Sequence, residues 1–151
     1  MGEPVRMVDI SGKEPVYREA TAEGFIRLRR ETVRLIREGR VEKGDPLAIA
    51  SVAATMAVKK VPELVPLAHN IPISNVRVEY EVLDDGVKAV VTVRTTARTG
   101  VELEALAGVL NALLNIWDVV KKYEKDEAGQ YPVTRIEGVR VVRKVKGAVR
   151  S

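Results

Sequence analysis

The most constraining feature of the sequence is a pair of strand-like segments followed directly by a long helix-like segment. Valine-rich runs over 73–82 and 87–93 are separated by Asp84-Asp85-Gly86, which is typical of a hairpin turn. Residues 101–125 then carry apolar side chains at helical spacing over a wide face. A hairpin and an apolar helix bury their faces best against each other, so we expect layers of α and β structure.

The first half of the chain supplies one more strand and two more helices. Partly alternating apolar residues predict a strand over 16–26, and a short helix is expected over 28–36. Asp45-Pro46 predicts the start of a helix over 46–60, because the carboxylate can cap free N–H groups and proline suits the first turn.

The rest of the chain completes the pattern. A proline-bracketed loop over 62–72 precedes the hairpin, and a last strand is expected over 133–142. The order predicts an α+β, ferredoxin-like sandwich: a four-stranded antiparallel sheet with helices packed on one face. We expect a single domain over 1–151, with loose tails at 1–15 and 146–151.

Composition narrows the chemistry. The chain has no cysteine and one histidine, which excludes disulfides and thiol nucleophiles and argues against a zinc site. A net charge of +4 favours anionic partners such as phosphates or nucleotides, although a general solubility charge explains it equally well. No apolar run approaches the roughly 20 residues needed to span a bilayer, and the N-terminus lacks a secretion pattern, so we expect a cytoplasmic protein.

Three positions suggest proton transfer. Lys43 precedes the predicted helix start at Asp45, where a phosphate could bind, although Asp45 capping with a solvated lysine explains the pattern as well. Asp118 and Lys121 are three residues apart and share one helix face. They form either a simple helical ion pair or a carboxylate that orients a proton-transferring lysine.

Two further groups suggest ligand binding, and helix geometry constrains how they meet the first. His69 lies in the proline-bracketed loop, and its position alone fits an ordinary loop histidine better than a functional one. Glu102 and Glu104 open the long helix, where they could also serve only the helix dipole. Glu104 and Asp118 are separated by about 21 Å along a straight helix. If both helix ends act on one small substrate, either the helix is broken or the site is shared between two copies of the chain, and we favour the shared site.

Five segments occur together in an order and at a spacing that resemble the MoaC family, the cyclic pyranopterin monophosphate synthases. They are Met7-Val8-Asp9-Ile10-Ser11, Lys43-Gly44-Asp45, Leu64-Val65-Pro66-Leu67-Ala68-His69, Thr99-Gly100-Val101-Glu102-Leu103-Glu104-Ala105-Leu106 and Trp117-Asp118-Val119-Val120-Lys121. Each motif is weak alone, but five in series are specific, and the resemblance runs over residues 7–146.

The resemblance implies a lyase of molybdenum cofactor biosynthesis with a ferredoxin-like subunit. Its substrate would be 3′,8-cyclo-7,8-dihydro-GTP, made by the radical enzyme MoaA, and its products cyclic pyranopterin monophosphate and pyrophosphate. It implies a homohexamer built as a trimer of dimers, with the active site at the dimer interface. No redox cofactor and no essential metal are implied.

The resemblance also assigns residues. Lys43, Lys121 and Asp118 match the catalytic positions, with lysines as acid and base. The matching substrate-binding positions are Leu67, Ala68, His69, Glu102, Leu103, Glu104, Arg18, Lys144 and, more weakly, Lys13. Many relatives flank the loop histidine with Cys and Pro, whereas this chain has Ala68-His69-Asn70.

Two rival interpretations stay open at this stage. A ferredoxin-like sheet with a basic surplus would suit RNA, but such sheets need aromatic side chains for base stacking, and aromatics make up only 4% of the chain. A non-catalytic oligomer that binds a nucleotide could use the same motif residues without turning the ligand over.

Overall fold

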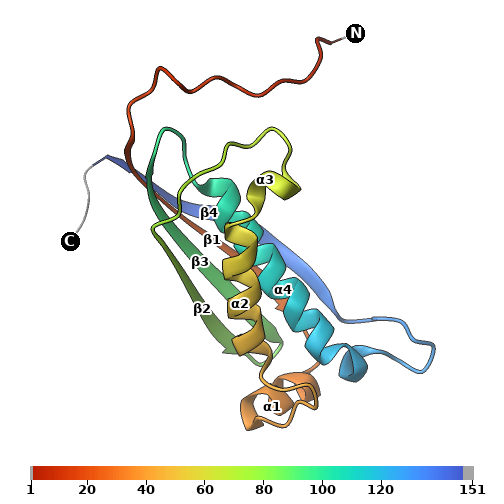
Figure 1. Ribbon diagram of the computed structural model, residues 1–151. Coiled ribbons are helices and arrows are strands. Elements are labelled where there is room, and N and C mark those ends of the chain that lie inside the picture. The colour runs from red at the N-terminus through yellow and green to blue at the C-terminus, as the bar shows by residue number, and fades with distance from the viewer. Residues whose placement is uncertain (1, 148–151) are drawn as a thin grey trace.

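The computed structural model describes residues 2–147, which form four strands and four helices (Figure 1). In chain order these are β1 (Val16–Arg27), α1 (Arg30–Glu38), α2 (Pro46–Val58), α3 (Val61–Leu64), β2 (Asn75–Leu83), β3 (Gly86–Ala97), α4 (Glu102–Glu124) and β4 (Arg135–Gly147).

The four strands form one antiparallel sheet in the order β2-β3-β1-β4. The predicted hairpin joins β2 to β3, and its turn lies at Asp84-Asp85. The connection from β1 to β2 contains α1, α2 and α3 and passes over β3. The connection from β3 to β4 contains α4 and passes over β1. This is the ferredoxin-like α+β arrangement that the order of elements predicted.

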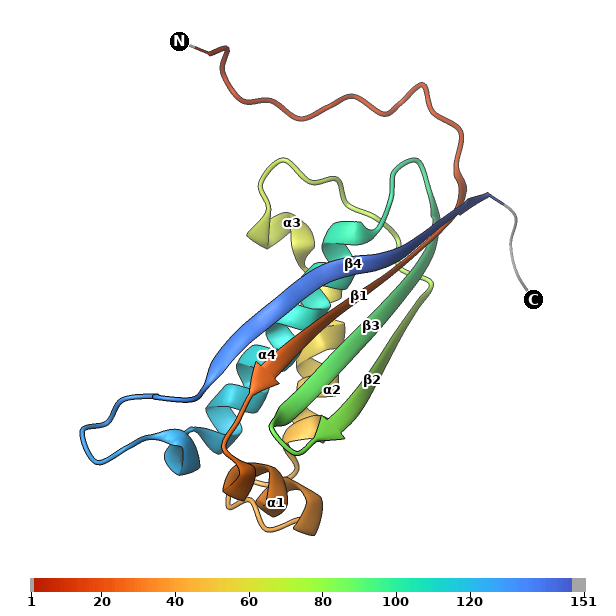
Figure 2. The same ribbon diagram turned by 180° about the vertical axis from the view of Figure 1, so that it is seen from behind.

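The helices cover one face of the sheet. Figure 1 shows α2 and α4 lying side by side in front of the strands, and Figure 2 shows the other face without a helix over it among the residues drawn. Alternate side chains of β1 and β3 point into the helical layer and are fully buried, including Ala20, Ala22, Val87 and Val91. Each buried valine or leucine in such a core contributes roughly 1.5–3 kcal/mol.

Local sequence signals explain where the helices begin and end. The Asp45 carboxylate accepts a hydrogen bond from the Leu47 N–H at 2.9 Å, so Asp45 caps α2 as predicted. Gly39 ends α1 with a φ of 66°, in the left-handed region where glycine carries no steric cost.

The expectation that no segment is long and apolar enough to cross a membrane does not hold for helix α4. By length and composition alone its 23 residues meet that criterion, the only helix in 2–147 to do so. Half of its apolar window is buried inside the protein, where α4 packs against α2 and the sheet. Packing in the core therefore accounts for its apolar character.

The structure differs from the sequence prediction in two other places. The loop over 62–72 contains the one-turn helix α3. Strand β4 runs to Gly147, five residues beyond the predicted end, so Lys146 and Gly147 pair with β1 instead of lying in a tail. Residues 148–151 of the expected tail lie outside the described residues, and residues 2–15 contain no helix or strand.

Candidate active site

Lys43, Asp118 and Lys121 lie together although 75 residues separate the first two in sequence. The Lys43 ammonium donates to the Asp118 carboxylate at 3.3 Å and to the Asp118 backbone carbonyl at 3.2 Å. From the next turn of α4, the Lys121 ammonium lies 3.2 Å from the same carboxylate oxygen. Two lysines therefore share one carboxylate oxygen of Asp118.

This cluster borders a cavity of about 270 Å³ between the loop that precedes α2 and the last turns of α4. The side chains of Lys43, Asp118 and Lys121 are each about half exposed, so a ligand can reach them. Hydrogen bonds from Lys121 and Lys43 lower the pKa of the Asp118 carboxyl, which stays ionised at neutral pH. An ionised Asp118 can accept hydrogen bonds from both ammonium groups, and each ammonium keeps at least one further N–H donor for a ligand.

The first turn of α4 holds the two glutamates in different environments. One Glu102 oxygen lies 3.4 Å from the Lys144 ammonium, and the other is buried without a hydrogen-bond partner among residues 2–147. Glu104 is only 3% exposed, and burial raises the pKa of its carboxyl. Leu103 between them is exposed, so neighbouring positions of this turn point in different directions.

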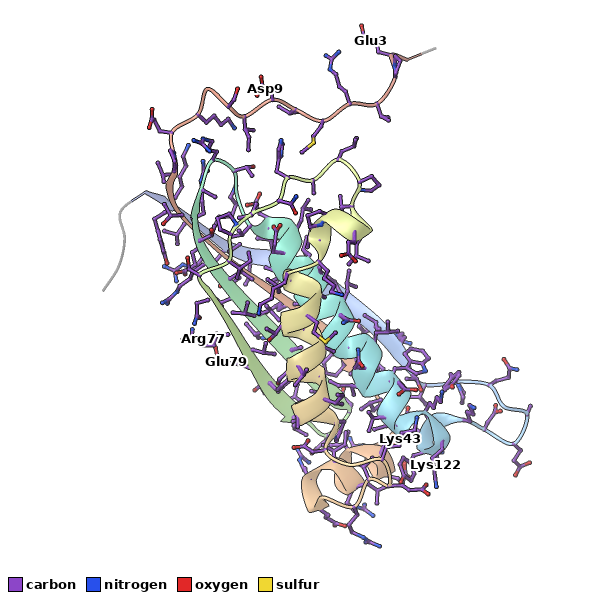
Figure 3. The ribbon with its side chains drawn as sticks, in the orientation of Figure 1. Glu3, Asp9, Lys43, Arg77, Glu79 and Lys122 are labelled. Atoms are coloured by element: carbon purple, nitrogen blue, oxygen red, sulfur yellow. The ribbon has the colours of Figure 1, made fainter. Side chains whose placement is uncertain are left out.

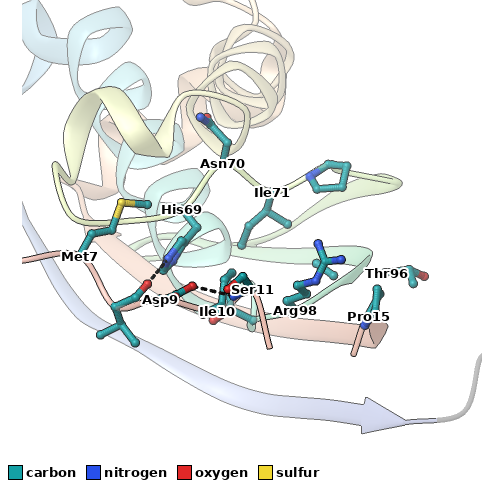
Figure 4. Close-up of a pocket in the computed structure, with 14 residues that line it drawn as sticks. Met7, Asp9, Ile10, Ser11, Pro15, His69, Asn70, Ile71, Thr96 and Arg98 are labelled. Atoms are coloured by element: carbon teal, nitrogen blue, oxygen red, sulfur yellow. Dashed lines mark hydrogen bonds between the residues drawn. The ribbon is translucent and has the colours of Figure 1, made fainter. Parts of the chain in front are cut away.

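The His69 loop lies against the N-terminal arm. His69 Nε2 is 2.6 Å from the carbonyl oxygen of Val8, and residues 7–11 form one wall of a cavity of about 530 Å³ (Figure 4). Figure 4 also shows Asp9 accepting a hydrogen bond from Ser11 beside the imidazole. The arm, expected to be loose, is thus in contact with the predicted binding loop, which also includes Leu67 and Ala68.

The three basic residues among the predicted substrate-binding positions lie at the same end of the sheet as His69. Arg18 donates to the backbone carbonyl of Ala97, at the end of β3. Lys144 pairs with Glu102 at the start of α4. Lys13 is in the arm, and its carbonyl accepts a hydrogen bond from Arg98 at 3.0 Å.

Within one chain the predicted residues form two groups rather than one. His69, Glu102, Glu104 and the three cations lie around the beginning of α4, and Lys43, Asp118 and Lys121 lie near its end. Figure 3 shows this separation, with Asp9 of the arm at one end of the molecule and Lys43 at the other. The separation from Glu104 to Asp118 is about 21 Å along the helix.

Several neighbours of these groups had no role in the sequence hypothesis. Beside Lys43, Glu42 contacts both Lys122 and Tyr123. Arg98 and Val8, the latter named before only as part of a motif, line the same cavity as His69. No local pattern predicts these contacts, because they join segments 61 to 85 residues apart. Within residues 2–147, no group of three or more His, Asp or Glu side chains is placed to hold a metal ion.

Comparison with known proteins agrees with the family suggested by the motifs. The MoaC family model matches residues 7–147. A relative from Aeropyrum pernix, named probable cyclic pyranopterin monophosphate synthase, is 64% identical over 93% of this chain and 97% of its own length. A relative of the same name from Pyrococcus abyssi is 57% identical over 94% of this chain and 89% of its own length. Another, from Sulfolobus acidocaldarius, is 56% identical over 93% of this chain and 98% of its own length. The chain described here therefore belongs to the MoaC family.

Proposed function

We propose that this protein is a cyclic pyranopterin monophosphate synthase, a lyase of molybdenum cofactor biosynthesis. It converts 3′,8-cyclo-7,8-dihydro-GTP to cyclic pyranopterin monophosphate and releases pyrophosphate. The observation that carries the proposal is the convergence of Lys43 and Lys121 on Asp118, at 3.3 and 3.2 Å, in a member of the MoaC family.

The proposed mechanism is acid–base catalysis by this cluster. Opening and rebuilding the purine ring system requires protons to be delivered and removed at several atoms, and lysines can do both. Lys43 acts as a general acid, Lys121 transfers protons beside it, and the ionised Asp118 orients both ammonium groups. Closure of the cyclic phosphate breaks the bond to pyrophosphate, whose charge the surrounding cations stabilise.

The other end of the molecule supplies the binding groups in this proposal. Arg18, Lys144 and Lys13 hold the triphosphate, since several cations are needed to neutralise it. Glu102 and Glu104 accept hydrogen bonds from N–H groups of the guanine-derived ring. The Leu67–His69 segment and Leu103 complete the pocket.

A second copy of the chain brings the two ends together. A substrate of this size cannot bridge about 21 Å within one chain. The outer surfaces of α2 and α4 expose large apolar side chains, including Met56, Leu103, Leu110 and Leu114, around a largely apolar groove. Such a surface suits a protein interface, and antiparallel pairing across a two-fold axis would place Asp118 of one copy near Glu104 of the other.

We propose that three such dimers form a homohexamer. The enzyme would act in the cytoplasm and receive its substrate from the radical enzyme MoaA. Sedimentation of the purified protein tests the assembly. A protein that stays monomeric while it turns over substrate would refute the shared site.

The activity test uses purified protein and 3′,8-cyclo-7,8-dihydro-GTP, with pyrophosphate release and the pterin product measured. Because one general acid or base contributes about 10²–10⁴-fold, Lys43→Ala, Lys121→Ala and Asp118→Asn should each lower kcat at least about 100-fold. Circular dichroism checks that the fold is kept, and Lys59→Ala, on the exposed end of α2, is the matched control. Wild-type rates in all three variants would refute the assigned roles, and binding without turnover by the wild type would favour the non-catalytic alternative.

Mixed assemblies test whether the site is shared. Lys121→Ala and Glu104→Ala damage opposite ends of α4, so each homo-oligomer should be inactive. Co-assembly of the two variants restores one intact site in some dimers, and activity should partly return. If assembly is verified and no activity returns, both groups act within one chain or not in one site.

A further inference from the structure

Lys43 reaches Asp118 from a tight turn whose position is fixed at several points. The Gly44 N–H donates to the Val41 carbonyl at 3.1 Å, which closes a turn with Glu42 and Lys43 at its centre. Val41 is 8% exposed and belongs to the core, so it fixes one side of the turn. The other side, which carries Lys43, faces the last turns of α4.

Tyr123 holds that second side. Its hydroxyl oxygen accepts a hydrogen bond from the Glu42 backbone N–H at 2.8 Å. The Tyr123 ring is half-buried and packs against the core, so the hydroxyl is held in place by the body of the protein. Tyr123 and Asp118 lie on the same helix, about 7.5 Å apart along its axis. One rigid element therefore holds both the turn and the carboxylate that the Lys43 ammonium contacts.

A second contact joins the same two segments. The Lys122 ammonium pairs with the Glu42 carboxylate and also lies 5.5 Å from the centre of the Tyr123 ring. Both partners of this ion pair are more than 60% exposed. Exposed pairs of this kind contribute little, because solvent screens them and both side chains lose freedom. The hydroxyl of the half-buried Tyr123 is therefore the stronger of the two attachments.

We propose that Tyr123 is a positioning residue for Lys43: by accepting the Glu42 N–H it fixes the turn, so that the Lys43 ammonium lies on Asp118. Tyr123 itself touches no reacting atom in this arrangement. The inference deepens the proposed function, on which its kinetic part rests, and the contact between Lys43 and Asp118 can be measured without any activity.

The kinetic test compares Tyr123→Phe with Tyr131→Phe. The first substitution keeps the ring and removes only the hydroxyl. The second removes a hydroxyl from a ring that packs edge-on against Trp117. Loss of one hydrogen bond should lower kcat of Tyr123→Phe about two- to tenfold with KM nearly unchanged, and Tyr131→Phe should match the wild type. Lys122→Met should lower kcat less than Tyr123→Phe does.

A double-mutant comparison separates positioning from general damage. In a Lys43→Ala background there is no ammonium to position, so adding Tyr123→Phe should change the residual rate by less than about 1.5-fold, within ordinary additivity error. If Tyr123→Phe lowers the rate in that background by the same factor as in the wild type, Tyr123 acts independently of Lys43 and the proposal is overturned.

The direct readout is titration of the Asp118 carboxyl by carbon NMR. Lys43 is one of the two groups that lower the pKa of Asp118, so releasing it should raise that pKa in Tyr123→Phe, toward the value in Lys43→Ala. An Asp118 titration in Tyr123→Phe that equals the wild type would overturn the proposal. If the wild type proves inactive, the proposed function fails, and this titration alone still decides whether Tyr123 positions Lys43.

Discussion

Gly24 lies where β1 packs against α4, and Gly24→Ala tests how tightly the two elements pack. A Cβ atom at this position would lie 2.7 Å from a methyl of Val109 and 3.0 Å from methyls of Leu113 and Val139. Carbon atoms prefer about 3.5–4.0 Å, so the contact with Val109 is short by about 1 Å. Val109 and Leu113 are fully buried, which leaves them no free space to move into.

The change that Gly24→Ala makes in the free energy of unfolding is the sum of two opposing effects. Overpacking a core costs about 1–3 kcal/mol, because side chains leave their rotamers or α4 moves away from the sheet. Replacing glycine by alanine at a compatible backbone position returns about 0.4–1 kcal/mol by restricting the unfolded chain. We expect a net loss of about 1–2 kcal/mol in the free energy of unfolding, or about 2–8 °C in Tm.

Guanidinium unfolding followed by circular dichroism measures this loss, at one fixed protein concentration because assembly also affects stability. Gly12→Ala is the matched control, since a Cβ there meets no atom within 4 Å. If Gly24→Ala is as stable as the wild type, or more stable, then α4 does not pack on β1 as closely as described.

Two other predictions concern buried carboxyl groups. Glu124 is fully buried and accepts hydrogen bonds from the hydroxyls of Thr32 and Thr134, so Glu124→Gln should lower the free energy of unfolding by about 1–3 kcal/mol. Glu127→Gln, in the exposed loop, is the control, and equal unfolding midpoints for the two variants would contradict this account. Burial raises the pKa of Glu104 above its ordinary value of 4.5. Between pH 4.5 and the raised pKa, the folded chain therefore binds more protons than the unfolded chain. The free energy of unfolding should then fall as the pH rises through the raised pKa. Glu104→Gln should flatten that part of the stability profile, and an unchanged profile would show that Glu104 does not cause it.

Much of the fold could be predicted from local sequence because the signals for its elements are local. The Asp84-Asp85 turn, the Asp45 cap and the apolar face of α4 each act within a few residues, and each lies where it was predicted. The predicted end of β4, at residue 142, was wrong for a physical reason. β4 is an edge strand, and its basic residues hide the alternation of apolar and polar side chains on which the prediction depended.

The candidate site could be predicted only in part. Asp118 and Lys121 share a helix face, so their pairing follows from helical spacing. Only its motif points to Lys43, because its contact with Asp118 depends on how the loop before α2 packs on α4. The same holds for Tyr123, which is 81 residues from its partner Glu42. Contacts of this kind arise from tertiary packing, and no periodicity along the chain predicts them.

The uncovered face of the sheet bears on the rival interpretation as an RNA-binding module. Its two aromatic side chains are on β1 and both are engaged. Tyr17 is 8% exposed and donates a hydrogen bond to Glu19 at 2.6 Å, and the Arg27 guanidinium lies 5.3 Å from the centre of the Phe25 ring. The neighbouring strand β3 contains no aromatic residue at all. Base stacking on this face would have to displace Arg27 and free a buried tyrosine, both of which oppose binding. The basic surplus of the chain is thus better matched to a small anionic substrate at the ends of α4 than to RNA on the open sheet.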